Sequence, residues 1–517
     1  MEFTPAEDAP QTSSYVQGFY LHTSWEFAYP FAVRSWDRED YRRYFQLLKT
    51  LNFNLVMFWP LTEAMPAPLS TPDRTELEAM RKLVDDAHGC GMDFWLTFCP
   101  NLTSRPEIAA DPFKRRHLYP FRIDVRLDDP EAKAAYLAHR SEILKVLNNA
   151  DAYVTIDGDP GGYPEAKPRQ FVEVLENDRA VIDRWGVNPQ QQKLIPWIWN
   201  GWGSDWEKHG FWNEPLEPFI EPFLEELRTL PEPWELLPGR HIREGRGNGR
   251  TVLEMTERVG LTEKSTLFCY EAIEYEPTPP AVVIQFDDIR RILKQEASLL
   301  EKSRGVMGNA QQPIMALPNL FFFARATSDP GYLDRSDIDV LRDLAVFLGG
   351  DAELLVPAWQ CLDLNLDSLP MDLAERLRGS LLSSVEAQLL PSGSEHYLEL
   401  LARFAETRLE VLQACSDHVE TSADAADRLC RMVSALYGWW LVHRYVFSGE
   451  NGTDFHWDFT HPKLMSPIEA WLKQSRVEPQ ALIEATVNKL VATGDWDESR
   501  ATVLLGELVD SDSESGA

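Results

Sequence analysis

The segment Ala152-Tyr-Val-Thr-Ile-Asp157-Gly-Asp159-Pro-Gly-Gly162 decides the fold class, because it joins a buried strand to a sharp turn. Its run of β-branched and aromatic residues is typical of a strand and stops at two carboxylates separated by one glycine. The proline and glycines that follow predict that the chain turns immediately. Apolar strands of this kind, each followed by a helix, build parallel sheets covered by helices.

The same alternation of strand and helix patterns extends in both directions along the chain. Repeated units of ~30–50 residues predict an α/β fold, a (β/α)8 TIM-type barrel. The barrel is incomplete at the last strand if Leu317–Arg325, which fits a strand or a helix opened by Pro318, is helical. The other predicted strands are Phe19–Trp25, Phe53–Pro60, Met92–Pro100, the strand before Asp157, Lys193–Asn200, Ser265–Glu271 and Gly305–Ala310. The predicted helices between them include Arg38–Leu51, Asp73–Gly89, Ala132–Asn148, Val172–Trp185 and Ile284–Ser303.

Composition divides the chain into regions. Residues 1–14 form an N-terminal tail, residues 15–370 form the barrel, and a Trp- and Pro-rich insertion occupies about 201–249. Residues 371–509 carry helical patterns alone, which predicts an all-α C-terminal domain, and residues 510–517 are polar enough to be disordered. The predicted C-terminal helices are Asp372–Leu390, Glu395–His418, Asp424–Phe447, Gln480–Ala492 and Asp497–Val509.

Charge and composition exclude several classes of partner. Asp and Glu outnumber Lys and Arg by 82 to 50, and the net charge of −32 repels phosphate backbones and anionic membranes. We therefore expect no nucleic-acid or membrane partner, and we expect no nucleotide cofactor because Gly-rich phosphate-binding motifs are missing. The six cysteines show no CxxC pairing, and the N-terminus lacks signal-peptide features, which predicts a cytoplasmic protein, or a secreted one if a leader was removed. Oligomeric state stays open, with a homodimer as one alternative.

Polar and aromatic residues gather at the predicted strand ends, where barrel enzymes place their chemistry. Trp and Tyr rings stack on sugar faces while Asn, Gln, His and Asp bind hydroxyls, so the set fits a carbohydrate substrate. Core packing is the better explanation for any single tryptophan, and a turn or helix cap explains Asn101 or Asn200 equally well. The candidate substrate-binding residues are His22, Trp25, Trp59, Asn101, Trp197, Trp199, Asn200, Trp202, Asn309 and Gln311, and the candidate catalytic residues are Asp157, Asp159 and Glu271.

The acids Asp157 and Asp159 have three interpretations. If the backbone stays extended past Ile156, both side chains point the same way, as acid/base or glycosyl-transfer chemistry requires. A turn whose carboxylates bind backbone amides is the second interpretation, and a metal loop is the third. Pro160 interrupts the EF-hand pattern, so no metal ligand set is predicted.

Several patches resemble retaining glycoside hydrolases of the β-hexosaminidase and α-glucuronidase kind. They are Tyr20-Leu-His-Thr-Ser-Trp25, the first helix from Tyr41 through Asn52, Phe58-Trp-Pro60 and the fourth-strand acids. The resemblance implies a general acid at the end of strand four, where hexosaminidases use an adjacent Asp-Glu pair and this chain has two Asp separated by a glycine. Gly308–Gln311 and Leu317–Phe323 are also similar to uncharacterised bacterial barrel proteins, which implies no activity.

The sequence therefore predicts a glycoside hydrolase that needs no cofactor. Asp159 or Asp157 is the expected general acid, with its pKa raised by its like-charged neighbour, and Glu271 is the expected nucleophile or base. A carbohydrate-binding barrel without catalysis is the alternative from another class. A metal-dependent lyase or isomerase is a further alternative.

Overall fold

Eight parallel strands form one sheet in the order β6-β5-β4-β3-β2-β1-β8-β7. The computed structural model describes residues 15–23, 28–100, 104, 106–116, 129–158, 167–198, 217–239, 252–269, 273, 284–310, 312–362, 369–416, 421–443, 462–474 and 477–510. The strands are β1 (Val16–His22), β2 (Leu55–Trp59), β3 (Asp93–Phe98), β4 (Ala152–Ile156), β5 (Lys193–Ile198), β6 (Leu237–Pro238), β7 (Thr266–Cys269) and β8 (Gly305–Asn309).

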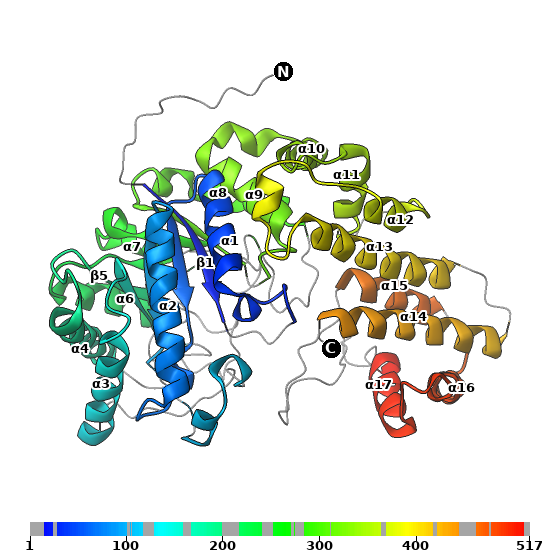
Figure 1. Ribbon diagram of the computed structural model, residues 1–517, viewed down its shortest axis with the longest axis horizontal. Helices are drawn as coiled ribbons and strands as arrows, with labels where there is room; N and C mark the ends of the chain where they lie inside the picture. Colours follow the sequence, from blue (N-terminus) through cyan, green and yellow to red (C-terminus); the bar gives the residue numbers. More distant parts are fainter. Residues whose placement is uncertain are drawn as a thin grey trace.

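The sheet closes on itself between β6 and β7. Two parallel bridges join these strands, one between Leu236 and Ser265 and one between Gly239 and Phe268. The Leu236 amide donates to the Lys264 carbonyl oxygen at 2.9 Å, which extends the same contact. The predicted fold class is confirmed: the chain forms a (β/α)8 barrel followed by a helical region (Figure 1).

Helices cover the outside of the barrel, and their ends follow local capping rules. Asp37 opens the first helix and Ser70 the second, each through a capping box that satisfies amides of the first turn. Figure 1 shows α1 and α2 running beside the strands at the N-terminal end of the chain. The helices of this part are α1 (Arg38–Thr50), α2 (Thr71–Gly89), α3 (Pro130–Leu144), α4 (Pro168–Trp185), α6 (Glu217–Glu226), α7 (Val252–Arg258), α8 (Phe286–Leu300) and α9 (Leu317–Ser328).

The identity of the eighth strand differs from the expectation. Leu317–Arg325 is helical and lies in α9, which has Pro318 in its first turn. The missing strand is β6, inside the range 201–249 that the composition marks as an insertion. A strand of two residues has no alternation that a sequence pattern could reveal. The predicted strands Ser265–Glu271 and Gly305–Ala310 are therefore the seventh and eighth of the barrel.

Only helices follow α9 among the described residues. In Figure 1, helices α13 to α17 lie beside the barrel, and α10 to α12 connect them to it. The predicted helix Asp372–Leu390 is wrong as one element, because α12 ends before Gly379 and a short 3₁₀ helix, Glu386–Leu389, follows a turn. The helices are α10 (Asp337–Phe347), α11 (Ala352–Gln360), α12 (Leu373–Arg378), α13 (Ser394–Ser416), α14 (Ser422–His443), α15 (Pro462–Gln474), α16 (Pro479–Thr493) and α17 (Glu498–Asp510).

The helical region packs against the connection between β1 and α1. The ring of Phe31 meets Trp439 of α14 edge-on, with centroids 6.2 Å apart. Asp40 of α1 accepts hydrogen bonds from the Tyr29 hydroxyl at 2.9 Å and from the Ser392 amide at 3.4 Å. Within the described ranges, none of the helices combines the length and the apolar character that a membrane crossing requires.

We expect Gly305→Ala to destabilise the barrel. Gly305 has φ 151°, and a methyl group there would overlap the backbone of Val16 on the neighbouring strand β1. The loss in the free energy of unfolding should be about 1–3 kcal/mol or more, measured by urea unfolding followed by circular dichroism. Gly506→Ala in α17 is the control, because among the described residues no atom beyond its chain neighbours and the nearby backbone of its own helix lies within 4 Å of the added methyl. This control should be neutral or stabilising by about 0.5–1 kcal/mol. Equal effects of the two variants would contradict the β1–β8 pairing.

Candidate functional site

The strand register places one set of side chains inside the barrel at its carboxyl-terminal mouth. Side chains alternate along a strand, and residues paired across a parallel ladder face the same way. His22 of β1 pairs with Trp59 of β2, and Tyr20 pairs with Asn309 of β8. The Tyr20 ring meets the Trp197 ring of β5 across the barrel, with centroids 5.3 Å apart, so this face is the interior. Four predicted residues, His22, Trp59, Trp197 and Asn309, therefore lie at one end of the barrel.

Three rings in mutual contact form a floor beneath the mouth, which we call the aromatic floor: Tyr20, Trp197 and Phe268. The Trp197 and Phe268 rings lie 4.6 Å apart, and Tyr20 lies 5.5 Å from Phe268. His22 stacks on Tyr20 at 5.4 Å. Trp197 is only 2% exposed, so it fills the barrel as core residues do. Tyr20 and Phe268 were not among the predicted site residues. For Tyr20 the signal was its two-residue spacing from His22, which places these two side chains on the same face of the strand.

Asn309 is a buried amide at the end of β8. Its side chain is 1% exposed, and its Oδ1 has no hydrogen-bond partner in the part of the chain that the structure describes. The hydroxyl of Thr97 on β3 is also buried and also has no hydrogen-bond partner among the described residues. An unsatisfied buried polar group costs about 1–3 kcal/mol and calls for an explanation such as a ligand. Asn309 therefore offers an acceptor to a molecule in the mouth.

Asp157 follows β4 directly and is fully buried. Its amide donates to the Trp197 carbonyl oxygen at 3.0 Å, which continues the β4–β5 ladder by one residue. Ile156 pairs with Trp197 and faces the interior, so alternation directs Asp157 to the side that Thr155 occupies. The next residue, Gly158, has φ 152°, a conformation open to glycine. The regular extension on which the common direction of the two acids depended therefore ends at Gly158.

Asp159 and Glu271 lie outside the described residues, as do the predicted binding residues Trp25, Asn101, Trp199, Asn200, Trp202 and Gln311. Among the described candidates, the interior face of the mouth brings together those from β1, β2, β5 and β8, whereas Asp157, after β4, is directed to the other side.

Glu63 lies near the mouth of the barrel but was not among the residues predicted from the strand ends. It lies on η2 (Thr62–Ala64), just after β2, and its side chain is buried. The Trp59 indole Nε1 donates to Glu63 Oε2 at 3.3 Å, and the Cys99 amide donates to Oε1 at 2.7 Å. Burial raises the pKa of Glu63, and the positive charge of Arg140 opposes this rise. No sequence pattern indicated it, because Cys99, which donates to one of its oxygens, is 36 residues away in sequence.

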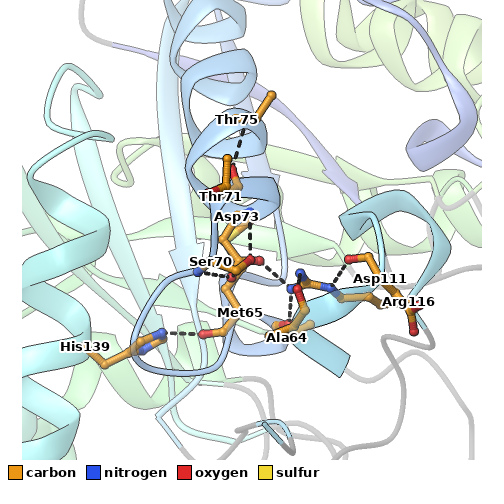
Figure 2. Close-up of polar contacts among 10 residues, drawn as sticks. Ala64, Met65, Ser70, Thr71, Asp73, Thr75, Asp111, Arg116 and His139 are labelled. Carbon is orange, nitrogen blue, oxygen red and sulfur yellow. Dashed lines mark hydrogen bonds and ion pairs between the residues drawn. The ribbon is translucent and has the colours of Figure 1, made fainter. Parts of the chain in front are cut away.

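Two cationic or polar side chains hold the backbone around Glu63 (Figure 2). Arg116 Nη1 donates to the Ala64 carbonyl oxygen at 2.8 Å, and His139 Nε2 donates to that of Met65 at 2.7 Å. Arg116 also forms a fully buried ion pair with Asp73 of α2, with Nη1 and Oδ1 2.5 Å apart. The connection from β2 to α2 is thus fixed to the segment that follows β3 and to α3.

A second buried network links this connection to β4. The Arg140 guanidinium lies 3.9 Å from the centre of the Phe98 ring, and its Nε lies 3.3 Å from Asp178 Oδ1. Arg140 Nη2 donates to the Tyr136 hydroxyl at 2.8 Å. Asp178 Oδ2 in turn accepts a hydrogen bond from Thr155 of β4 at 2.8 Å. Charge therefore reaches the outer face of β4 two residues before Asp157.

The described residues contain no group of three or more His, Cys, Asp or Glu side chains placed to hold a metal ion. A shallow cavity of about 530 Å³ lies between α4 and α6. Its lining residue Arg169 already pairs with Glu176 at 2.8 Å.

No protein-family model matches the chain, and no curated protein sequence matches it. Among solved structures, a mutant O-GlcNAc hydrolase of Thermobaculum terrenum is 11% identical, with a TM-score of 0.42 over 96% of this chain and 94% of that one. Two proteins named CpGH84D and CpGH84B are each 12% identical and match 96% of this chain and 70% and 74% of their own, with TM-scores of 0.40 and 0.39.

We expect Arg116→Met to destabilise the protein strongly, because it leaves the buried Asp73 carboxylate without its counter-charge. Removing one partner of a buried pair costs about 3–5 kcal/mol, which urea unfolding would measure. Combining it with Asp73→Asn removes the stranded charge and should recover part of that loss. Glu39→Gln is the control, because it breaks the exposed pair with Arg42 (3.0 Å) and should cost less than about 1 kcal/mol. Similar losses for Arg116→Met and Glu39→Gln would contradict a stabilising role of the buried ion pair between Arg116 and Asp73.

Stability should depend on pH through His139. Burial lowers the pKa of His139 below its ordinary value of 6.5, so the unfolded chain binds more protons between the folded pKa and 6.5. The free energy of unfolding therefore falls as pH drops through this window, and His139→Gln should lessen that fall. Urea unfolding between about pH 5 and 8 measures the difference.

His88 provides the control of opposite sign. Its hydrogen bond to Asp151 raises the pKa of His88, so its stabilising contribution is present below 6.5 and is lost as pH rises through the folded pKa. His88→Gln should therefore remove stability at the acid end of the range. Parallel pH profiles for the two variants would contradict the lowered pKa of His139.

Proposed function

We propose that the chain is a glycoside hydrolase that binds its sugar at the carboxyl-terminal mouth of the barrel. The supporting observation is the buried amide oxygen of Asn309, which has no hydrogen-bond partner among the described residues; Asn309 pairs in register with Tyr20 of the aromatic floor. A sugar presents hydroxyl groups around an apolar ring face, so it needs a hydrogen-bond acceptor beside aromatic surface. His22 and Trp59 complete the described part of this site.

The proposed catalytic groups are the carboxylates that the sequence places at the strand ends. Asp159 or Asp157 donates a proton to the leaving glycosidic oxygen, and Glu271 acts as nucleophile or as the base that activates water. The burial of Asp157 beside the Trp197 carbonyl supports Asp159 as the donor and Asp157 as the residue that orients the turn. Water supplies the hydroxyl that the sugar gains and the proton that restores the acid.

The distance between the acid and its partner decides the stereochemical outcome. A separation of about 5–5.5 Å predicts a covalent intermediate and retention, and about 6.5–9.5 Å leaves room for a water and predicts inversion.

Residues 15–370 are the proposed catalytic domain, and residues 371–509 are the proposed helical domain. The six cysteines are all free, which supports the cytoplasm as the compartment.

Activity on a panel of 4-nitrophenyl glycosides and oligosaccharides tests the proposal. We expect Asp159→Asn and Glu271→Gln to lower kcat by about 10²-fold or more, because each removes a proton-transfer or nucleophilic group. Asn309→Ala should raise KM by about tenfold or more, since it removes a hydrogen bond to a buried polar partner. Released nitrophenol and product chromatography measure both effects.

Asp495→Asn is the matched control, because Asp495 is exposed on the helical region and should leave activity unchanged. Full activity in both Asp159→Asn and Asp157→Asn would refute the acid assignment. Sugar binding without turnover by the wild type would instead identify a carbohydrate-binding barrel. Loss of turnover upon chelation, restored by a divalent metal ion, would favour the lyase or isomerase alternative.

A further inference from the structure

Glu63 ties the ends of two neighbouring strands together. The ladder between β2 and β3 has its last pair at Phe58 and Leu96. Beyond that pair, one carboxylate accepts from the Trp59 indole at 3.3 Å and from the Cys99 amide at 2.7 Å. Both Glu63 oxygens therefore receive donors from the barrel wall, and the carboxylate continues the connection where the backbone ladder stops.

A buried cation, Arg140, acts electrostatically on this carboxylate. Burial raises the pKa of Glu63, and the positive charge of Arg140 opposes this rise. Arg140 is in turn held by Tyr136 and Asp178, and Asp178 accepts from Thr155 of β4. A buried carboxylate is stable only when it is paired and hydrogen-bonded in this way. The hydrogen bonds from Trp59 and Cys99 therefore hold the carboxylate in one orientation.

The backbone that carries Glu63 is also constrained. Leu61, two residues earlier, has φ 51° and ψ 47°, a left-handed conformation that disfavours a bulky residue. Such conformations cost about 1–3 kcal/mol and persist where surrounding contacts impose them. The backbone just after Glu63 is held by Arg116, which donates to the Ala64 carbonyl oxygen, and by His139, which donates to that of Met65 (Figure 2).

We propose that Glu63 is a positioning residue that fixes the orientation of the Trp59 ring at the mouth and thereby the affinity for the sugar. The inference rests on the proposed function for its ligand, and the contact with Trp59 stands independently of it. Trp59 pairs in register with His22, so its indole lies on the interior face, and Glu63 holds the only N–H of that ring. Glu63 acts through Trp59 and does not contact the reacting atoms.

Glu63→Gln keeps the size of the side chain and removes its charge and one acceptor. We expect KM for the best 4-nitrophenyl glycoside of the panel to rise about tenfold, with kcat within about threefold of the wild type, since only ring orientation changes. In the Trp59→Phe background, Glu63→Gln should have no further effect on KM, because the coupled partner is gone. Glu78→Gln, on the exposed side of α2, is the matched control and should change neither value.

Two readouts need no sugar and separate this proposal from the proposed function. The near-ultraviolet circular dichroism assigned to Trp59, as the difference between wild type and Trp59→Phe, should diminish in Glu63→Gln and be retained in Glu78→Gln. In the wild type, the ¹⁵N-labelled indole N–H assigned by Trp59→Phe should exchange slowly with solvent. This second measurement does not require any Glu63 variant to fold.

Rapid exchange of that N–H, or an unchanged Trp59 dichroism in Glu63→Gln, would overturn the positioning role. A fall in kcat at unchanged KM would also overturn it, in favour of a direct part in the chemistry. Additive effects of Glu63→Gln and Trp59→Phe on KM would show that the two residues act separately. If no sugar binds, the proposed function fails, while the exchange and dichroism measurements still decide the contact.

Discussion

The parallel register of the barrel strands is the constraint on which the rest of the structure depends. Since alternate residues of a strand face opposite sides, a slip of one residue would exchange the interior and exterior sets. In the observed register, Tyr20 and Trp197 meet inside the barrel, while Thr155 faces outward and donates to Asp178 of α4. The same register brings His22, Trp59 and Asn309 to one mouth. The positions of the site residues therefore depend on the strand pairing along the whole barrel wall.

Buried cations are the second organising element, in a chain whose net charge is −32. Lys114 and Arg116 come from a basic run, yet both are used internally: Lys114 Nζ donates to the Trp36 carbonyl oxygen at 2.7 Å, and Arg116 pairs with Asp73. Arg34 Nη2 donates in the same place to the Lys114 carbonyl oxygen at 3.1 Å. Such side chains satisfy carbonyl oxygens of irregular backbone, which would otherwise be buried without partners. Positive charge here holds the loops near the mouth.

The sequence pattern predicted those strands that are long enough to show a pattern. The five predicted strands from Phe19–Trp25 through Lys193–Asn200 match β1 to β5, while β6 has two residues and no detectable pattern. Leu317–Arg325 is mostly apolar and shows no clear period, so only its length and Pro318 favoured the helix that it forms. His22, Trp59, Trp197 and Asn309 followed from strand ends. Glu63 did not, because its role depends on Cys99, which is 36 residues away in sequence. The shared direction of Asp157 and Asp159 required an extended backbone that Gly158 interrupts.

The shortness of β6 leaves the barrel wall with few backbone connections at this strand. Other neighbouring strands are joined by continuous ladders, whereas β6 meets β7 through two isolated bridges, and its second residue, Pro238, has no N–H to contribute. The ladder between β5 and β6 also has only two pairs, so this strand is weakly joined on both sides. We expect the barrel wall to open at β6 at a lower free energy than elsewhere. The β1–β2 side, with its ladder of five pairs, should keep its shape.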